Sequence, residues 1–171
     1  IDAQVNALSG GGYIVSWTGV DGAASQGVFA QRYDAAGDPM GGRLALNTTT
    51  SSQQNEASVR QLSDGSLIAV WTSNNQDGSQ GGVYAQIFNT AGVPVGGEFL
   101  INNETEFSQS GATILPTASG FIVAWQTYGA GLNLNGQGAI SFRMFDNAGA
   151  ALGAQVNVDN VTAGIAATPN L

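Results

Sequence analysis

Tryptophan recurs at Trp17, Trp71 and Trp125, so that each copy lies 54 positions after the previous one. Each Trp ends an apolar, strand-like run: YIVSW at 13–17, LIAVW at 67–71 and FIVAW at 121–125. Self-similarity at a fixed period of this size marks a repeat architecture, in which one supersecondary unit is copied and the copies pack side by side. The 171-residue chain is therefore expected to fold as three related units.

A second block repeats after each Trp and aligns without gaps, as GVFAQRYDAAGDPMGGRLALN, GVYAQIFNTAGVPVGGEFLIN and AISFRMFDNAGAALGAQVNVD. The loop before this block varies in length, as expected of a solvated surface connection. We predict one repeat domain over 1–171 with units of approximately 1–47, 57–102 and 111–159, and the start of a fourth unit at 164–171. On this interpretation the chain is a piece of a longer repeat array.

Each unit is expected to contain four antiparallel strands. In the second unit these are 57–62, the Trp run, 83–88 and 98–102, with turns at SDGS (63–66) and at Asn89–Gly92. Gly, Asp and Asn suit these turns because they tolerate positive φ or bond their own backbone. The pairs Gly41-Gly42 and Gly96-Gly97 precede a strand, which favours a bulge or a tight corner over a phosphate-binding loop.

The Trp strand favours one architecture, because it is apolar on both faces. Leu67, Ala69 and Trp71 oppose Ile68 and Val70. A strand covered on one face alternates apolar and polar residues, whereas one covered on both faces reads as a continuous apolar run. We therefore predict an all-β fold in which the units are blades of a partial β-propeller. A β-trefoil, a β-prism with three-fold pseudo-symmetry, or a sandwich are the alternatives.

Composition excludes several partners and reactions. The chain has no Cys, no Lys and no His, and its twelve acids against four Arg give a net charge of −8. Nucleic-acid binding is not expected, because it needs clustered cations. Membrane insertion is not expected either, because no apolar stretch approaches the ~20 residues of a spanning helix. Serine triads, thiol nucleophiles and Schiff bases lack their residues.

The second unit, with the string VW…GVYAQIFNTAGVPVGGEFLIN, resembles tandem units of very large secreted bacterial proteins of the RTX or adhesin-like kind. Such proteins often carry calcium-binding glycine-rich repeats elsewhere, although the nonapeptide itself is absent here. The resemblance implies an extracellular or cell-surface location and an adhesive or matrix role. It also implies that the partners are neighbouring repeats of the same or another chain, together with cell-surface glycans.

These observations predict a non-enzymatic structural or adhesive module, with a lectin-like carbohydrate-binding propeller module as the alternative. A carboxylate glycosidase is the third class considered. It requires two acids that converge in one cleft. The acids of this sequence fall at turns or singly, so the sequence assigns no catalytic residue.

Two binding sites are predicted. Asp21 and Asp77 precede Gly in the variable loop, and Asn74 and Asn75 lie nearby. Calcium takes carboxylate, amide and carbonyl oxygens, so these four residues form a candidate calcium site. The alternative is that they form simple Asx-Gly turns without a metal. The three Trp are expected in the core. Tyr128, in the long third loop, is the better candidate for stacking on a sugar.

Overall fold

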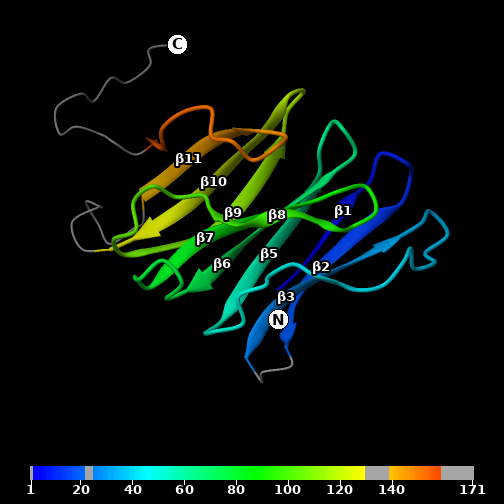
Figure 1. Cartoon of the computed structure of the whole chain (residues 1–171), viewed down its shortest axis with the longest axis horizontal. Helices are drawn as coiled ribbons and strands as arrows, with labels where there is room; N and C mark the ends of the chain where they lie inside the picture. Colours follow the sequence, from blue (N-terminus) through cyan, green and yellow to red (C-terminus); the bar gives the residue numbers. More distant parts are fainter. Residues whose placement is uncertain (1, 22–24, 130–138, 159–171) are drawn as a thin grey trace, which may run out of the picture.

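The computed structural model describes residues 2–21, 25–129 and 139–158, and these residues form twelve β-strands and no helix (Figure 1). The first four strands are β1 Ala3–Ala7, β2 Tyr13–Val20, β3 Gln26–Tyr33 and β4 Leu44–Ala45. The next four are β5 Gln54–Gln61, β6 Leu67–Asn74, β7 Gly81–Phe88 and β8 Pro94–Leu100. The last four are β9 Ser108–Pro116, β10 Gly120–Tyr128, β11 Ala139–Asp146 and β12 Val156–Asn157.

Each group of four strands is one antiparallel blade in which neighbours along the chain pair with each other. A parallel bridge between Gly81 and Ser108 joins the second and third blades. The first strands of the blades are the innermost, and β5 lies between β1 and β9 (Figure 1). The expected all-β fold of four-stranded units is confirmed. The described strands do not close a ring.

Two strands begin earlier than predicted. β5 starts at Gln54, whereas the sequence indicated 57, and β8 starts at Pro94, whereas the sequence indicated 98. In β8 the extra length contains a register shift, and Gly96 there has a φ of 70°. The glycine pair therefore forms a bulge, as predicted, because a residue without Cβ adopts positive φ at little cost. The described residues contain no helix long and apolar enough to cross a membrane.

Apolar side chains fill the spaces between blades. Residues of the first blade such as Ile14, Val28 and Ala30 pack against the Trp71 face of the second blade. Residues on the opposite face of the second blade, such as Ile68 and Val70, pack in the same way against the Trp125 face of the third. Each blade is thus covered on both faces only where it has two neighbours, which explains the continuous apolar runs.

Trp17 departs from the predicted equivalence of the three tryptophans. Trp71 is 0% and Trp125 1% exposed, whereas Trp17 is only half-buried and contacts the ring of Phe29. The physical reason is its position, since no blade of the described chain covers that face of the first blade. The expectation of three core tryptophans is correct for two of them.

A buried Asn links the outer strand of each of the first two blades to the blade that follows. The Asn47 side-chain oxygen accepts a hydrogen bond from the Val28 N–H (2.9 Å), and Asn102 does the same for Val83 (2.8 Å). The amide nitrogen of Asn102 donates to Gln109 Oε1 (3.3 Å), at the start of the third blade. These bonds satisfy backbone groups that would otherwise be buried without partners.

Glu98 fastens β8 of the second blade to the loop that follows the first blade. Its carboxylate accepts hydrogen bonds from the backbone N–H groups of Thr48 and Thr49, from both hydroxyls, and from the side chain of Gln76. At the corresponding place in the third blade, Gln155 Oε1 accepts from the Asn103 N–H (3.0 Å). Position 98 and its counterpart at 155 therefore connect neighbouring blades by accepting hydrogen bonds from the loop of the preceding blade.

We expect Glu98→Gln to lower the free energy of unfolding at neutral pH by about 1–2 kcal/mol, because an amide has one acceptor oxygen in place of two charged ones. Desolvation raises the pKa of Glu98, but the hydrogen bonds from Thr48, Gln76 and Thr49 outweigh it, so the folded-state pKa is lowered. Its stabilisation is therefore present above the unfolded-state pKa of ~4.3 and is lost as pH falls through the folded value.

Urea denaturation between pH 3 and pH 7 measures this effect. The difference between wild type and Glu98→Gln should shrink as the solution is acidified. Glu104→Gln, a change of an exposed acid, serves as the matched control. A difference in the free energy of unfolding that is constant over the whole pH range would contradict a stabilising role of the ionised Glu98 carboxylate.

Candidate active site

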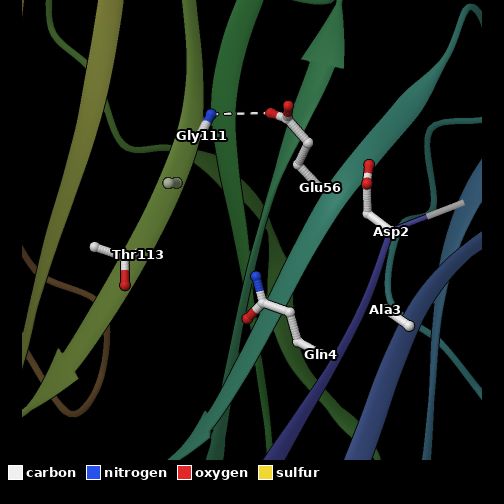
Figure 2. A pocket seen from close by; sticks show the side chains of 7 residues that line it. Asp2, Ala3, Gln4, Glu56, Gly111 and Thr113 are labelled. Atoms are coloured by element: carbon white, nitrogen blue, oxygen red, sulfur yellow. Dashed lines mark hydrogen bonds between the residues drawn. The ribbon is translucent and has the colours of Figure 1, made fainter.

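A pocket of about 590 Å³ lies where the first strands of the three blades converge. It is lined by residues of all three blades: Asp2, Ala3, Gln4, Glu56, Gly111, Ala112 and Thr113. Figure 2 shows the carboxylates of Asp2 and Glu56 at one end of this axial pocket, with Gln4 and Thr113 toward the other. The pocket therefore lies on the pseudo-symmetry axis of the repeat.

Asp2, Glu56 and Gly111 occupy equivalent positions of the sequence repeat. The residues just before the three tryptophans pair with Gln4, Ser58 and Thr113 on the first strands. Counting back two residues from each partner reaches Asp2, Glu56 and Gly111. Two copies of the repeat thus bring a carboxylate to the axial pocket, and the third brings a glycine.

The backbone at Glu56 is specialised for this place. β5 shifts register between Asn55 and Ser58, and Glu56 has a φ of 58°. β9 shifts register at the same point, where Gly111 has a φ of 65°. A non-glycine residue in this left-handed region costs of order 1–3 kcal/mol, and bulges that re-aim a side chain are common beside functional sites. The bulge directs Glu56 into the axial pocket.

The Glu56 carboxylate is held in a defined orientation. Its Oε2 accepts hydrogen bonds from the Thr72 hydroxyl (2.9 Å) and from the Gly111 N–H (2.9 Å), the second of which crosses from one blade to the next (Figure 2). Thr72 is buried and lies on the neighbouring strand β6. Two donors on one oxygen restrict the rotation of the side chain and fix the carboxylate at the wall of the pocket.

Asp2 is exposed, and its backbone carbonyl accepts a hydrogen bond from the Thr18 N–H (3.2 Å). Thr18 is the counterpart of Thr72 in the first blade. Its buried hydroxyl has no hydrogen-bond partner among the described residues. Asp is one methylene shorter than Glu, so the contact made in the second blade is not repeated in the first. The two carboxylates of the axial pocket are therefore differently restrained.

The charge of the axial pocket selects its ligands. Asp2 and Glu56 are both acids, and the residues that line the pocket with them include no base. The two carboxylates repel anions such as phosphate. Neutral polyhydroxylated molecules can donate hydrogen bonds to the carboxylates and to the Gln4 and Thr113 side chains. The arrangement suits a sugar.

The two aspartates predicted to bind calcium accept hydrogen bonds within local turns. Asp77 Oδ1 accepts from the Ser79 N–H (3.0 Å), and Asp21 Oδ1 accepts from the Ser25 N–H (3.1 Å). The backbone N–H groups of Asn74 and Asn75 donate to the carbonyls of Gln53 and Gln80 (3.0 and 2.9 Å). Asp21 follows β2 and Asp77 follows β6, so they belong to separate blades.

Nowhere in the described residues do three or more His, Cys, Asp or Glu side chains gather as a metal site would require. The Asx turn, weighed against calcium in the sequence, is the arrangement found at Asp77. Calcium binding stays a prediction.

Tyr128 lies outside the axial pocket. It ends β10, is exposed, and its hydroxyl bonds the side chain of Gln126 on the same strand. The remainder of the long third loop, 130–138, falls outside the described residues. The sugar-stacking prediction for Tyr128 therefore stays a prediction.

Sequence reasoning missed both acids of the axial pocket, because it judged each acid by its own neighbours. A signal was present, since Asp2 and Glu56 are separated by the same 54 positions as successive tryptophans. Only the convergence of β1 and β5 turns two such isolated residues into a pair.

No protein-family model matches the chain, and no curated protein matches it. Solved structures do. The fold is similar to that of an endo-arabinase from Bacteroides thetaiotaomicron VPI-5482, with a TM-score of 0.63 and 16% identity over 91% of this chain and 59% of the enzyme. It is also similar to a thermostable family-43 glycoside hydrolase, with a TM-score of 0.61, 8% identity, and 92% and 53% coverage.

An alpha-L-arabinofuranosidase from Lactobacillus brevis gives a TM-score of 0.58 at 13% identity, over 90% of this chain and 51% of that enzyme. The chain thus spans between half and three fifths of the length of these hydrolases. At such identities the likeness is one of fold, and it supports the propeller-like all-β architecture expected from the sequence.

The same comparison overturns two expectations. The sequence predicted a non-enzymatic structural or adhesive module, with a lectin-like module as the alternative, and no enzyme. These predictions are contradicted, because the solved structures that share the fold are glycoside hydrolases. The expectation rested on acids that fall at turns or singly along the sequence, whereas glycoside hydrolysis needs a pair of carboxylates that converge in space.

Proposed function

We propose that the axial pocket is a glycoside-hydrolysing site in which Asp2 and Glu56 are the carboxylate pair. The observation that carries this proposal is the placement of two repeat-equivalent acids on one pocket, one of them on a strained bulge. The fold of the glycoside hydrolases described above supports it. The chain covers between half and three fifths of the length of those enzymes, so their activity enters here only as part of the proposal.

The two acids divide the chemistry according to how they are restrained. Glycoside hydrolysis uses one carboxylic acid to protonate the leaving oxygen and one carboxylate to act as base or nucleophile at the anomeric carbon. Glu56 Oε2 accepts two hydrogen bonds and is therefore suited to the carboxylate role. With Glu56 in the carboxylate role, Asp2 is the remaining acid of the axial pocket and is assigned the proton donor.

The substrate class follows from the polarity of the pocket. Neutral polysaccharides that contain arabinose, the sugar in the names of two of the similar enzymes, fit a pocket lined by acids, an amide and a hydroxyl. An extracellular location, which the sequence predicted, suits a polymer that cannot enter a cell, and it stays part of the proposal.

Release of reducing ends from a panel of neutral polysaccharides, arabinan and xylan among them, tests the proposal with the purified chain. We expect product from at least one polymer and none from the double variant Asp2→Asn/Glu56→Gln. Glu104→Gln, an acid outside the axial pocket, should keep the wild-type rate. No product from folded wild-type protein, or binding of a polymer without cleavage, would contradict hydrolysis.

A further inference from the structure

A second pocket lies between the first and second blades, at the opposite end of β1 from the axial pocket. Its volume is about 330 Å³, and the residues that line it include Leu8, Ser9, Gly10, Arg32, Asp34 and Gln61. We call it the seam pocket. A strand rises ~3.3 Å per residue, so ~20 Å of chain separates Leu8 from Asp2 of the axial pocket. All walls of the seam pocket belong to the described residues and to an internal blade interface.

Arg32 brings a charge to this end of the first interface, where the second interface is apolar. It occupies the position of the repeat that Ile87 occupies in the second blade. Ile87 packs against the turn at Gly149 of the third blade, and Arg32 lies in the same way against the turn at Gly92 of the second. Because apolar packing joins the second and third blades here, a guanidinium is not required for the contact itself.

The Arg32 guanidinium is oriented by the protein and keeps further donors. Its Nη1 and Nη2 donate hydrogen bonds to the carbonyls of Thr90 (2.7 Å) and Ala91 (3.0 Å). A guanidinium has five N–H groups, so others remain for a ligand. No acid among the described residues forms an ion pair with Arg32. Arg32 is therefore a fixed hydrogen-bond donor in the wall of the seam pocket.

Acceptors lie in the same wall. Asp34 Oδ1 accepts from the backbone N–H groups of Ala36 and Asp38 (2.9 Å each), and Oδ2 has no partner in the described part of the chain. Gln61 Oε1 accepts from the Ser9 N–H (2.7 Å), which joins the second blade to the turn after β1. The seam pocket therefore offers a carboxylate oxygen and the Ser9 hydroxyl beside the donors of Arg32.

Gly10 keeps a side chain out of the seam pocket. The turns at Gly11 and Gly65 have the same shape, with φ of 87° and 85°, and the second turn carries Asp64 at the position of Gly10. A Cβ on Gly10 would meet no atom within 4 Å, and the φ of Gly10 lies outside the left-handed region. Neither space nor backbone conformation requires glycine at this position, and its effect is to leave room for a ligand.

The chemistry of the seam pocket fits a neutral sugar. A sugar hydroxyl both donates and accepts hydrogen bonds, so neighbouring hydroxyls can bond Arg32 and Asp34 together. Leu8 and Met40, which is 46% exposed, offer apolar surface to the C–H face of a sugar ring. An anion would be repelled by Asp34 and by the net charge of −8, and a cation would be repelled by Arg32.

We propose that the seam pocket is a second sugar-binding site, which holds a neutral saccharide away from the axial pocket. It accompanies the hydrolytic site proposed above and does not depend on it, because the two sets of lining residues have no member in common. If the ligand is part of a polymer, binding at the seam pocket raises the effective concentration of that polymer at the axial pocket.

A nuclear magnetic resonance titration of the isotope-labelled chain with L-arabinose, D-xylose and D-glucose tests the proposal, because amide shifts report where a ligand binds. We expect saturable shifts at Ser9, Gly10 and Gln61 with at least one of these sugars. Arg32→Ile installs the residue that the second blade carries, and it should raise the Kd at least about tenfold through the loss of charged donors. Gly10→Asp installs the counterpart Asp64 and should weaken binding by filling the space.

Arg43→Ile is the matched control, because it makes the same substitution at an exposed arginine of the first blade outside the seam pocket. It should bind sugar like wild type. The double variant Asp2→Asn/Glu56→Gln should also keep the wild-type Kd at these amides, which separates the seam pocket from hydrolysis. Circular dichroism and thermal melts show whether each variant is folded.

The absence of saturable shifts at the seam pocket with all three sugars would overturn the proposal. So would an unchanged Kd in folded Arg32→Ile, or in Gly10→Asp if Arg32→Ile does not fold. Shifts at the same amides with sodium phosphate and with no sugar would show an anion site and would also overturn it. A chain that binds sugar at the seam pocket but hydrolyses no polymer would refute the proposed activity alone.

Discussion

Trp71→Ala should lower the free energy of unfolding by roughly 3–5 kcal/mol, the cost of truncating a large aromatic inside a core. Trp71 is fully buried between the first and second blades, and its indole nitrogen has no hydrogen-bond partner among the described residues. Its contribution is therefore packing alone. The cavity left by truncation opens in the middle of an inter-blade interface.

Trp17→Ala is the matched comparison, because Trp17 occupies the same position of the repeat with one side uncovered. We expect a cost of roughly 1–2 kcal/mol, in line with partial burial of an apolar side chain. Urea denaturation with a linear extrapolation gives both values. Equal costs for the two substitutions would contradict the asymmetry between covered and uncovered blade faces.

The second large effect is on catalysis. Glu56→Gln should lower kcat/KM by about 10²–10⁴-fold on any glycan the chain cleaves, the range for removal of a positioned acid or base. The amide keeps the shape of the side chain and can still accept hydrogen bonds from Thr72 and Gly111, so the loss reports the charge. Initial-rate kinetics on the polymer identified in the panel measures it.

Two further variants separate the reaction from the fold. Glu56→Gly places glycine at a φ of 58°, as Gly111 does at 65°, and should leave the free energy of unfolding within about 1 kcal/mol of wild type while activity is lost. Thr72→Val removes one donor to Glu56 and should lower kcat more than it raises KM, since Thr72 positions a carboxylate and does not touch substrate. Full activity of Glu56→Gly would rule out a catalytic role for this residue.

Most of the fold could be predicted from the sequence, because its signals are local or periodic. The interval between the tryptophans revealed the repeat, the turn residues at Asn89–Gly92 marked a hairpin, and the apolar runs indicated strands covered on both faces. The bulge at Gly96 followed from a glycine pair before a strand. Each of these inferences needs only neighbours along the chain or a comparison between copies.

The sequence was a poor guide to function for the same reason. Each acid stands alone in its local sequence, and the chain has no His, Lys or Cys for nucleophilic catalysis. These features favour a non-enzymatic role. That prediction was wrong in the light of the hydrolases that share the fold. A pair of carboxylates has no sequence spacing of its own, because the two partners are 54 positions apart and meet only across a blade interface.

What the sequence by itself determined is the repeated strand pattern, since side-chain period and turn chemistry depend on adjacent residues. What only the tertiary structure decided is which copies are covered and which acids converge. Trp17 and Trp71 have the same local context, yet one is half-buried and the other fully buried, because burial depends on the number of neighbouring blades. Likewise Asp2 and Glu56 share a pocket only because β1 and β5 run side by side around one axis.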